Sequence, residues 1–365
     1  MFSCDSPLLR AFPPPRFLVA PATGLHISSR ALRHVAFTVS GAHLKLAYAE
    51  EAPLPDGVFK DGELLQRDAL KTALLALKEK GRVRSVHASL PEQQAFIFPL
   101  HIPPTPPSQI RAVLMKEIAE RVPFPADDIV FDYEYAPRTP ETPVGALSVS
   151  IAVIPKTVVS AYSTLFRECG VELQSLEFGA HALLRALLPK EDMGSSILVS
   201  IDSGETSIAL VKDHLVRFTA TVNVGGMMLT EALVKKLGIS YGDANALKKR
   251  SGIQQNTEGI PMAEILLPPL SALRDEIKRY YIDWHTTMEE TDRGQEQAEK
   301  IILCGEEASV PGLVDYLRGS LKEDVVLGNP WQNVHPLTNY TPDLPRTEAL
   351  AYATAFGLAL RSFSC

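Results

Sequence analysis

The chain has few cysteines, no strongly basic segment and no long hydrophobic run, and each absence excludes a class of protein. Its four cysteines, among 365 residues, lie far apart in the sequence, and their spacing fits neither a zinc site nor a dithiol redox motif. No apolar run approaches the ~20 residues that cross a bilayer, so we expect a cytoplasmic protein without direct membrane insertion. A formal net charge of −7 gives no general attraction for nucleic acid.

The composition favours more than one globular unit. Hydrophobic residues make up 45% and charged residues 22%, which is ample material for folded cores. Single cores rarely grow beyond about 250 to 300 residues, so we expect two lobes. Residues 1–20 contain three successive prolines at 13–15 and are predicted to form an extended arm, because proline fixes φ and removes a hydrogen-bond donor.

Short apolar segments predict a meander of three antiparallel strands at the start of each half of the chain. The predicted strands are 23–28, 34–39 and 43–49 in the first half, and 197–202, 206–212 and 215–222 in the second. Helical periodicity follows each meander, so the order of elements repeats after about 170 residues. We therefore expect an α/β fold with a duplicated core.

Residues 90–172 are predicted to form an inserted α+β subdomain, since strands there alternate with two helical segments. Its first strand, in EQQAFIFPLHI, places Phe96, Phe98 and Leu100 on one face. Two interpretations stay open for these side chains: they contact an extended partner peptide, or they fill the core of the subdomain.

Six segments, in order from about Pro14 to Ser362, carry a family resemblance. They read GLHISSRALRHVAF, LPDGVFKDGEL, IPPTPPSQIRAVLMKEIAERVPFPADDIVFDYE, NVGGMMLTEALVKKLGIS, IILCGEEASVPGLVDYL and EALAYATAFGLALR. Together they resemble the PilM family of type IV pilus assembly proteins, actin-like relatives of the division protein FtsA. The resemblance implies an actin-like (ribonuclease H-like) two-lobed fold with an inserted subdomain.

The same resemblance implies a cytosolic scaffold that is peripheral to the inner membrane through its partner, the N-terminal tail of a PilN-like membrane protein. It places this tail in a groove between the first lobe and the inserted subdomain, and it leaves self-association open. The expected lobes are 21–89 with 173–193 and 343–365, and 194–240 with 298–342. A helical subdomain is expected at 241–297.

An actin-like ATP site needs carboxylates for the metal and bare backbone for the phosphates. In the first hairpin, GLHISSRALR, the comparison with family members puts His26 at the Asp place, Ser28 at the first Gly place and Arg33 at the Lys place. In the second hairpin, the turn DSGET would bring Asp202 and Gly204 near a phosphate. A solvated turn aspartate is the alternative interpretation.

Two further loops complete the comparison. Gly225 and Gly226 precede a helix whose free N–H groups would favour an anion, although a turn that requires glycine explains them equally well. Further on, Lys248 is kept, whereas Asn245 stands where the family has a Glu. The loop LCGEEASVPGL keeps Gly305, but Glu306 and Glu307 replace two glycines. At ~6 Å each would repel a phosphate charge by roughly 3 kcal/mol.

We therefore expect a degenerate ATP site with no catalytic residues, no metal ligands and no required cofactor; ATP with Mg²⁺ remains possible only if the site is retained. Its candidate residues are Arg33, Asp202, Gly204, Gly225, Gly226, Lys248 and Gly305. The predicted function is that of a pseudo-ATPase scaffold. The alternatives are an ATP-driven switch of the same system, or an FtsA-like division protein, for which a basic amphipathic helix after LALRSFSC would be expected.

Overall fold

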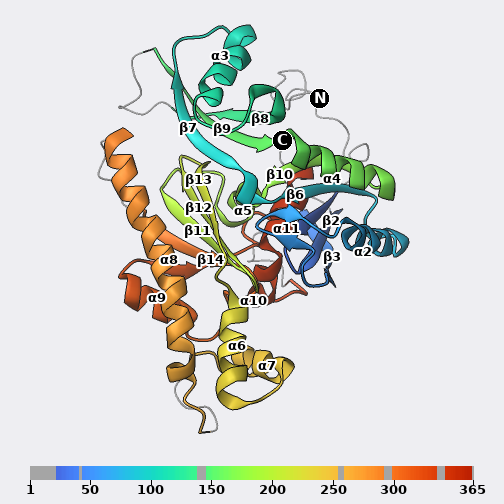
Figure 1. The fold of residues 1–365 in the computed structure, drawn as a ribbon, viewed down its shortest axis with the longest axis vertical. Coiled ribbons are helices and arrows are strands. Elements are labelled where there is room, and N and C mark those ends of the chain that lie inside the picture. Colours follow the sequence, from blue (N-terminus) through green and yellow to red (C-terminus); the bar gives the residue numbers. More distant parts are fainter. Residues whose placement is uncertain are drawn as a thin grey trace.

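The computed structural model describes residues 22–40, 43–137, 145–253, 259–291, 298–334 and 342–363. The predicted arm at 1–20 lies outside the described residues. Two five-stranded sheets form the centres of two lobes, which stand beside each other in Figure 1. A third, three-stranded sheet lies at one end of the molecule, and helices α6 and α7 lie at the other.

The first sheet has the strand order β10-β6-β1-β2-β3. Its strands are β1 (Thr23–Ile27), β2 (Ala31–Ser40), β3 (His43–Pro53), β6 (Ser85–Leu90) and β10 (Glu172–Phe178). The first three strands form the predicted antiparallel meander, whereas β6 and β10 join in parallel. A small hairpin, β4 (Phe59–Lys60) and β5 (Glu63–Leu64), follows the meander.

The second sheet repeats this arrangement strand for strand, with the order β13-β12-β11-β14-β15. Its strands are β11 (Ser196–Ile201), β12 (Thr206–Lys212), β13 (Leu215–Val222), β14 (Lys300–Cys304) and β15 (Val325–Leu327). Again the first three are antiparallel and the last two add in parallel. The predicted duplication of the core is confirmed.

Helices cover the sheets and separate the lobes. They are α2 (Arg67–Glu79), α3 (Pro107–Ala119), α4 (Lys156–Cys169), α5 (Gly179–Leu187), α6 (Gly226–Leu237), α7 (Tyr241–Ser251), α8 (Met262–Thr291), α9 (Leu313–Leu321), α10 (Arg346–Ala349) and α11 (Ala353–Leu360). Every residue of α11 is buried. This helix packs against α5 and against β1 of the first sheet. Helices α5 and α11 therefore form part of the buried interior.

The inserted subdomain has a sheet and a hydrophobic core of its own. Its sheet has the order β7-β9-β8, with β7 (Phe96–Ile102), β8 (Ile129–Tyr135) and β9 (Leu147–Pro155). The buried face of α3 joins one side of this sheet in a separate core. Helix α4, which the sequence analysis grouped with this subdomain, instead buries Tyr162, Leu165 and Phe166 in the main core of the lobes.

Candidate functional site

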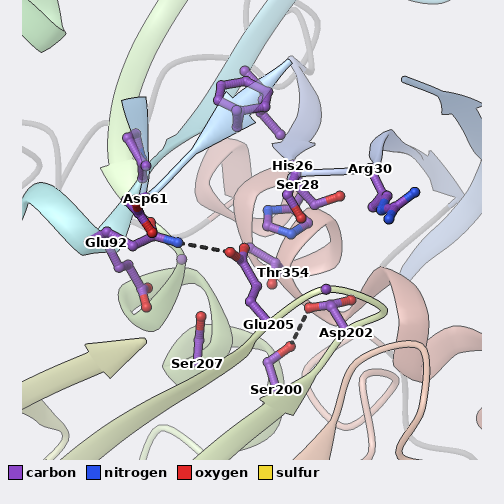
Figure 2. A pocket seen from close by; sticks show the side chains of 18 of the residues that line it. His26, Ser28, Arg30, Asp61, Glu92, Ser200, Asp202, Glu205, Ser207 and Thr354 are labelled. Atoms are coloured by element: carbon purple, nitrogen blue, oxygen red, sulfur yellow. Dashed lines mark hydrogen bonds between the residues drawn. The ribbon is translucent and has the colours of Figure 1, made fainter. Parts of the chain in front are cut away.

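The turns that end β1 and β11 face each other across the junction of the two lobes. A cavity of about 380 Å³ lies between them. Figure 2 shows His26, near the end of β1, and Ser28, in the turn that follows, opposite Asp202 and Glu205 of the second turn. This is the place where the resemblance puts a nucleotide.

Arg33, on β2, is bound to three carboxylates rather than left free for a ligand. Its side chain is 2% exposed. It donates from Nε to Glu51 (2.7 Å), from one terminal nitrogen to Asp202 (3.0 Å) and from the other to Glu306 (2.8 Å). Burial alone would lower the pKa of Arg33, but these three carboxylates raise it above its ordinary value. Each of the three guanidinium nitrogens therefore has a carboxylate partner within the protein.

Both carboxylate oxygens of Asp202 are also engaged. One accepts from Arg33, and the other accepts from the hydroxyl of Ser200 at 3.1 Å. Neighbouring Gly204 lines the cavity, where an added Cβ would lie 3.3 Å from the hydroxyl of Ser29. The residues predicted in the second turn therefore do reach the cleft, but Asp202 serves an ion pair there.

Gly225 and Gly226, at the start of α6, lie directly against other protein atoms. A Cβ at Gly225 would lie 2.5 Å from the carbonyl oxygen of Asp202. The N–H groups of Gly226 and Met227 donate to the carbonyls of Asp202 (3.0 Å) and Ser203 (2.7 Å). The expectation that this helix end offers free N–H groups is therefore wrong for these two, because the second turn already satisfies them.

Lys248 and Glu307 form a buried ion pair beside the same turn. Each side chain is 1% exposed, and Nζ lies 2.7 Å from Oε1. Burial lowers the pKa of Lys248, and the charge of Glu307 opposes that shift. Lys248 also donates to the carbonyl of Gly226 at 3.2 Å. A Cβ at Gly226 would lie only 2.1 Å from the carboxyl carbon of Glu307, so Glu307 fills the space above this glycine.

These pairs correct the expected electrostatic effect of Glu306 and Glu307. Each carboxylate is matched by a cation, Arg33 for one and Lys248 for the other, and Lys249 adds a second contact to Glu306 at 3.3 Å. The prediction that Glu306 and Glu307 act as two free charges and repel a phosphate is therefore wrong. Both glutamates are held in ion pairs, and Glu307 also occupies the space over Gly226.

Gly305 has a local structural role. Its φ is 91°, and an added Cβ would lie 2.5 Å from the carbonyl oxygen of Ile201. Its N–H donates to the carbonyl of Leu350 at 3.0 Å. A glycine is required here because the positive φ and the neighbouring strand leave no room for a side chain.

The cavity also contains two acids that the sequence analysis missed, Glu92 and Glu205. Glu92 accepts a hydrogen bond from the N–H of Ala180 at the start of α5, and Glu205 accepts from the amide of Gln93 at 2.9 Å. Burial raises the pKa of each to about 7, and it lowers the pKa of His26 to about 4. Nothing in their local sequence distinguishes these glutamates from surface acids.

The raised pKa values predict how stability depends on pH. The native protein keeps protons on Glu92 and Glu205 that an unfolded chain releases, so the free energy of unfolding falls as pH rises from about 4.5 to about 7. The double variant Glu92→Gln, Glu205→Gln lacks this loss. We expect it to gain up to roughly 6–7 kcal/mol of stability relative to wild type as pH rises through that window, because each carboxyl contributes about 1.4 kcal/mol per pH unit between its unfolded and folded pKa; urea denaturation measures the gain. A pH-independent difference would contradict the buried, protonated state.

The three residues predicted on β7 belong to the core of the subdomain. Leu100 is 6% exposed, and Phe96 and Phe98 are partly buried against the same cluster. Phe96 also packs edge-on against Phe124, with ring centroids 5.8 Å apart. The core-filling interpretation therefore applies to Leu100, and the partner-contact interpretation is wrong for it.

A groove of about 440 Å³ separates the inserted subdomain from the first lobe. One wall comes from β8 and β9, and the other from β10, α5 and Arg361. Both β8 and β10 are edge strands of their sheets. Val130, on β8, is 38% exposed. The groove thus combines two strand edges with an accessible apolar side chain.

Charged residues fix the first-lobe wall of the groove. Glu177, on β10, is buried and accepts from Arg185 at 2.7 and 3.0 Å, and Arg361 also binds it. Burial alone would raise the pKa of Glu177, but the two arginines lower it below its ordinary value. On the opposite wall, Asp132 and Glu134 come from β8. The β8 wall is therefore acidic.

Among the residues that the structure describes, no helix combines the length and the apolarity that crossing a membrane requires. Within the same ranges, no group of three or more His, Cys, Asp or Glu side chains is arranged to hold a metal ion.

Several solved structures have a similar fold. A solved PilM–PilN type IV pilus biogenesis complex matches with 22% identity, a TM-score of 0.76, and coverage of 95% of this chain and 100% of that chain. EutJ from Carboxydothermus hydrogenoformans (15% identity, TM-score 0.53, 94% and 93% coverage) and ADP-bound MreB5 of Spiroplasma citri (11%, 0.53, 92% and 94%) share the actin-like fold.

Among curated sequences, the cell division protein FtsA of Enterococcus hirae is 24% identical over 233 residues, which are 56% of this chain and 51% of FtsA. The chain thus spans about half the length of that relative. A family model described as type IV pilus assembly protein PilM matches residues 24–363. The chain therefore belongs to the PilM family of type IV pilus assembly proteins.

Proposed function

We propose that the protein is a scaffold of the type IV pilus assembly platform at the inner membrane. On this proposal, the groove between β8 and β10 binds the cytoplasmic N-terminal tail of a PilN-like membrane protein, and the cleft between the lobes hydrolyses no ATP. The observation that carries the proposal is the groove itself, because it is bounded by two strand edges.

Strand edges suit an extended peptide. β8 pairs only with β9 and β10 only with β6 within the sheets of the described residues, so each strand keeps backbone groups that can pair with an added strand. Side chains of the peptide would then contact the apolar Val130, Leu176 and Phe178, which line the groove. A tail with apolar residues at alternate positions fits this surface.

The acidic β8 wall adds a preference for charge. Asp132 and Glu134 line the groove from β8, whereas the guanidinium of Arg111 lies over the ring of Phe131, 4.4 Å from its centroid. Glu177 pairs with both Arg185 and Arg361, so the first-lobe wall keeps one net positive charge. A tail with lysine or arginine facing β8 and an acidic residue facing β10 would therefore complement the groove.

The proposed lack of ATPase activity rests on the committed state of the cleft. Arg33 and Asp202 bind each other, and Glu307 occupies the space over Gly226. A nucleotide would have to displace these contacts before its phosphates could approach the backbone. It would also find no unpaired N–H at Gly226 or Met227.

The test is calorimetric titration of a synthetic peptide with the tail sequence of the PilN-like protein, with and without millimolar Mg·ATP. We expect binding that Mg·ATP does not change. Val130→Lys, in the groove, should weaken it at least about tenfold by placing a charge against the apolar contact. The matched control is Val39→Lys, which changes an exposed valine on β2 (44% exposed) and should leave the affinity unchanged.

Two results would count against the proposal. If the peptide fails to bind, or binds Val130→Lys as well as wild type, the groove is not the partner site. If Mg·ATP changes the affinity, the alternative of a nucleotide-driven switch is favoured instead.

A further inference from the structure

One buried cation connects the two lobes at the tips of their sheets. Arg33 belongs to the first lobe, and two of its three carboxylate partners, Asp202 and Glu306, belong to two loops of the second lobe. The third partner, Glu51, lies on the neighbouring strand β3 and orients the guanidinium from its own side. The planar guanidinium suits this position because its donors point in three fixed directions.

Arg33 is the cation that carboxylates of both lobes share. Asp202, Glu306 and Glu51 all lie within hydrogen-bond distance of Arg33. Without the cation, the carboxylates of the two lobes would face one another in a partly desolvated site, and their repulsion would favour separation of the lobes. In a nucleotide-driven cleft, a metal ion bound to phosphates supplies the charge between the hairpins. Here a side chain supplies it.

The position of the second lobe is transmitted to the inserted subdomain by two contacts. Gln93 lies in the short helical turn η2 (Glu92–Gln94), just before β7, and donates to Glu205 at 2.9 Å. Ser150, on β9, donates from its buried hydroxyl to the carbonyl of Val216 on β13 at 2.6 Å. Ser150 also lines the partner groove. The second lobe therefore supports the wall of the groove from behind.

We infer that Arg33 is a built-in tie between the lobes: it takes the place of a metal–nucleotide complex and, by holding the second lobe against the inserted subdomain, sets the width of the partner groove. The first half of this inference concerns the cleft alone, and the second half rests on the proposed function. The protein would thus keep one closed arrangement permanently, without a nucleotide cycle.

The test uses the full chain and the variant Arg33→Ala, with Arg121→Ala as the control. Arg121 forms an exposed pair with Glu117 on α3, so its loss removes an arginine without touching the cleft. We expect Arg33→Ala to show a larger radius of gyration in small-angle X-ray scattering and an about tenfold higher Kd for the tail peptide. Millimolar guanidinium should reverse both changes, whereas ammonium at equal ionic strength should not.

If Arg33→Ala does not fold, the variant Arg33→Lys provides the test. It keeps the charge but cannot bind three carboxylates in a fork, so we expect an intermediate loss of tail affinity and a partial expansion. Unchanged scattering and affinity in the folded variants, or equal rescue by ammonium, would overturn the inference. If wild type binds no tail peptide, the proposed function fails, and the scattering and rescue measurements still decide whether Arg33 closes the cleft.

Discussion

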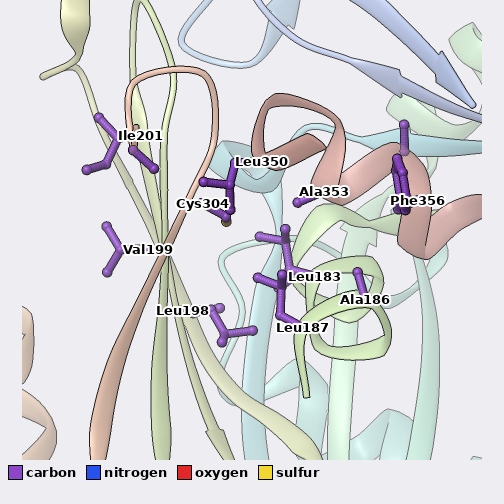
Figure 3. Close-up of a cluster of buried hydrophobic side chains, with 14 of the residues drawn as sticks. Leu183, Ala186, Leu187, Leu198, Val199, Ile201, Cys304, Leu350, Ala353 and Phe356 are labelled. Carbon is purple, nitrogen blue, oxygen red and sulfur yellow. The ribbon is translucent and has the colours of Figure 1, made fainter. Parts of the chain in front are cut away.

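Gly357→Ala is expected to prevent folding or to lower the free energy of unfolding by more than ~4 kcal/mol. A Cβ at this position of α11 would lie 1.8 Å from the carbonyl oxygen of Ala182 on α5 and 2.4 Å from its carbon. Both contacts are with backbone, so no side-chain rotation relieves them. Helices α5 and α11 pack against each other, and Figure 3 shows Leu183 next to Ala353. Urea denaturation followed by circular dichroism measures the effect.

The control for this variant is Gly319→Ala on α9. No heavy atom lies within 4 Å of a Cβ built there, and the residue lies in the last turns of a helix. Alanine loses less backbone entropy on folding than glycine, so we expect a gain of ~0.5–1 kcal/mol. If Gly357→Ala unfolds at the same urea concentration as Gly319→Ala, the direct contact between α5 and α11 is refuted.

Glu307→Ala is expected to lower the free energy of unfolding by about 3–5 kcal/mol, because it leaves the buried amine of Lys248 without its counter-ion. The cost has an upper limit, since Lys248 can release its proton. Its pKa is already lowered by burial, and loss of Glu307 removes the charge that opposes this shift. The native state then binds fewer protons than the unfolded state, so stability rises with pH. The deficit should shrink as pH is raised above neutral, measured by denaturation at several pH values.

A double variant separates the loss of the pair from the loss of its partner. Lys248→Met combined with Glu307→Leu removes both charges and keeps apolar volume, and replacements of this kind are often neutral or stabilising. We expect it to be much closer to wild type than Glu307→Ala. A double variant as unstable as Glu307→Ala would mean that packing around the side chains, rather than the unpaired amine, causes the loss.

Much of the fold could be predicted because short segments of the sequence carry the signals for its strands and helices. The apolar periods of the two meanders correspond to β1 to β3 and to β11 to β13, and the repeated order of elements led to the duplicated core. The prediction that His26 stands at the place of a metal-organising acid, with Glu306 and Glu307 at the places of two glycines, also came from the local sequence. These features depend on residue type and short-range spacing, which a sequence states directly.

The occupants of the cleft could not be predicted in this way. Arg33 meets Asp202 and Glu306, which are 169 and 273 residues away, and Lys248 meets Glu307 across 59 residues. No local pattern selects such partners, so the two glutamates were taken for free charges. The packing of Leu100 stayed open between two interpretations, and α4 was grouped with the inserted subdomain, for the same reason. An alternating strand and an amphipathic helix each have an apolar face, but the sequence does not specify which surface covers it.

The sequence by itself therefore determined the family and the two repeated sheets, and it predicted a degenerate nucleotide site. The tertiary structure alone decided which groups meet in the cleft and beside it: a guanidinium between the hairpins, a buried lysine–glutamate pair over Gly226, and a groove between two strand edges. The reason is physical, since periodicity and residue type fix local conformation, whereas the partner of a buried charge is fixed only when distant segments pack and exclude water.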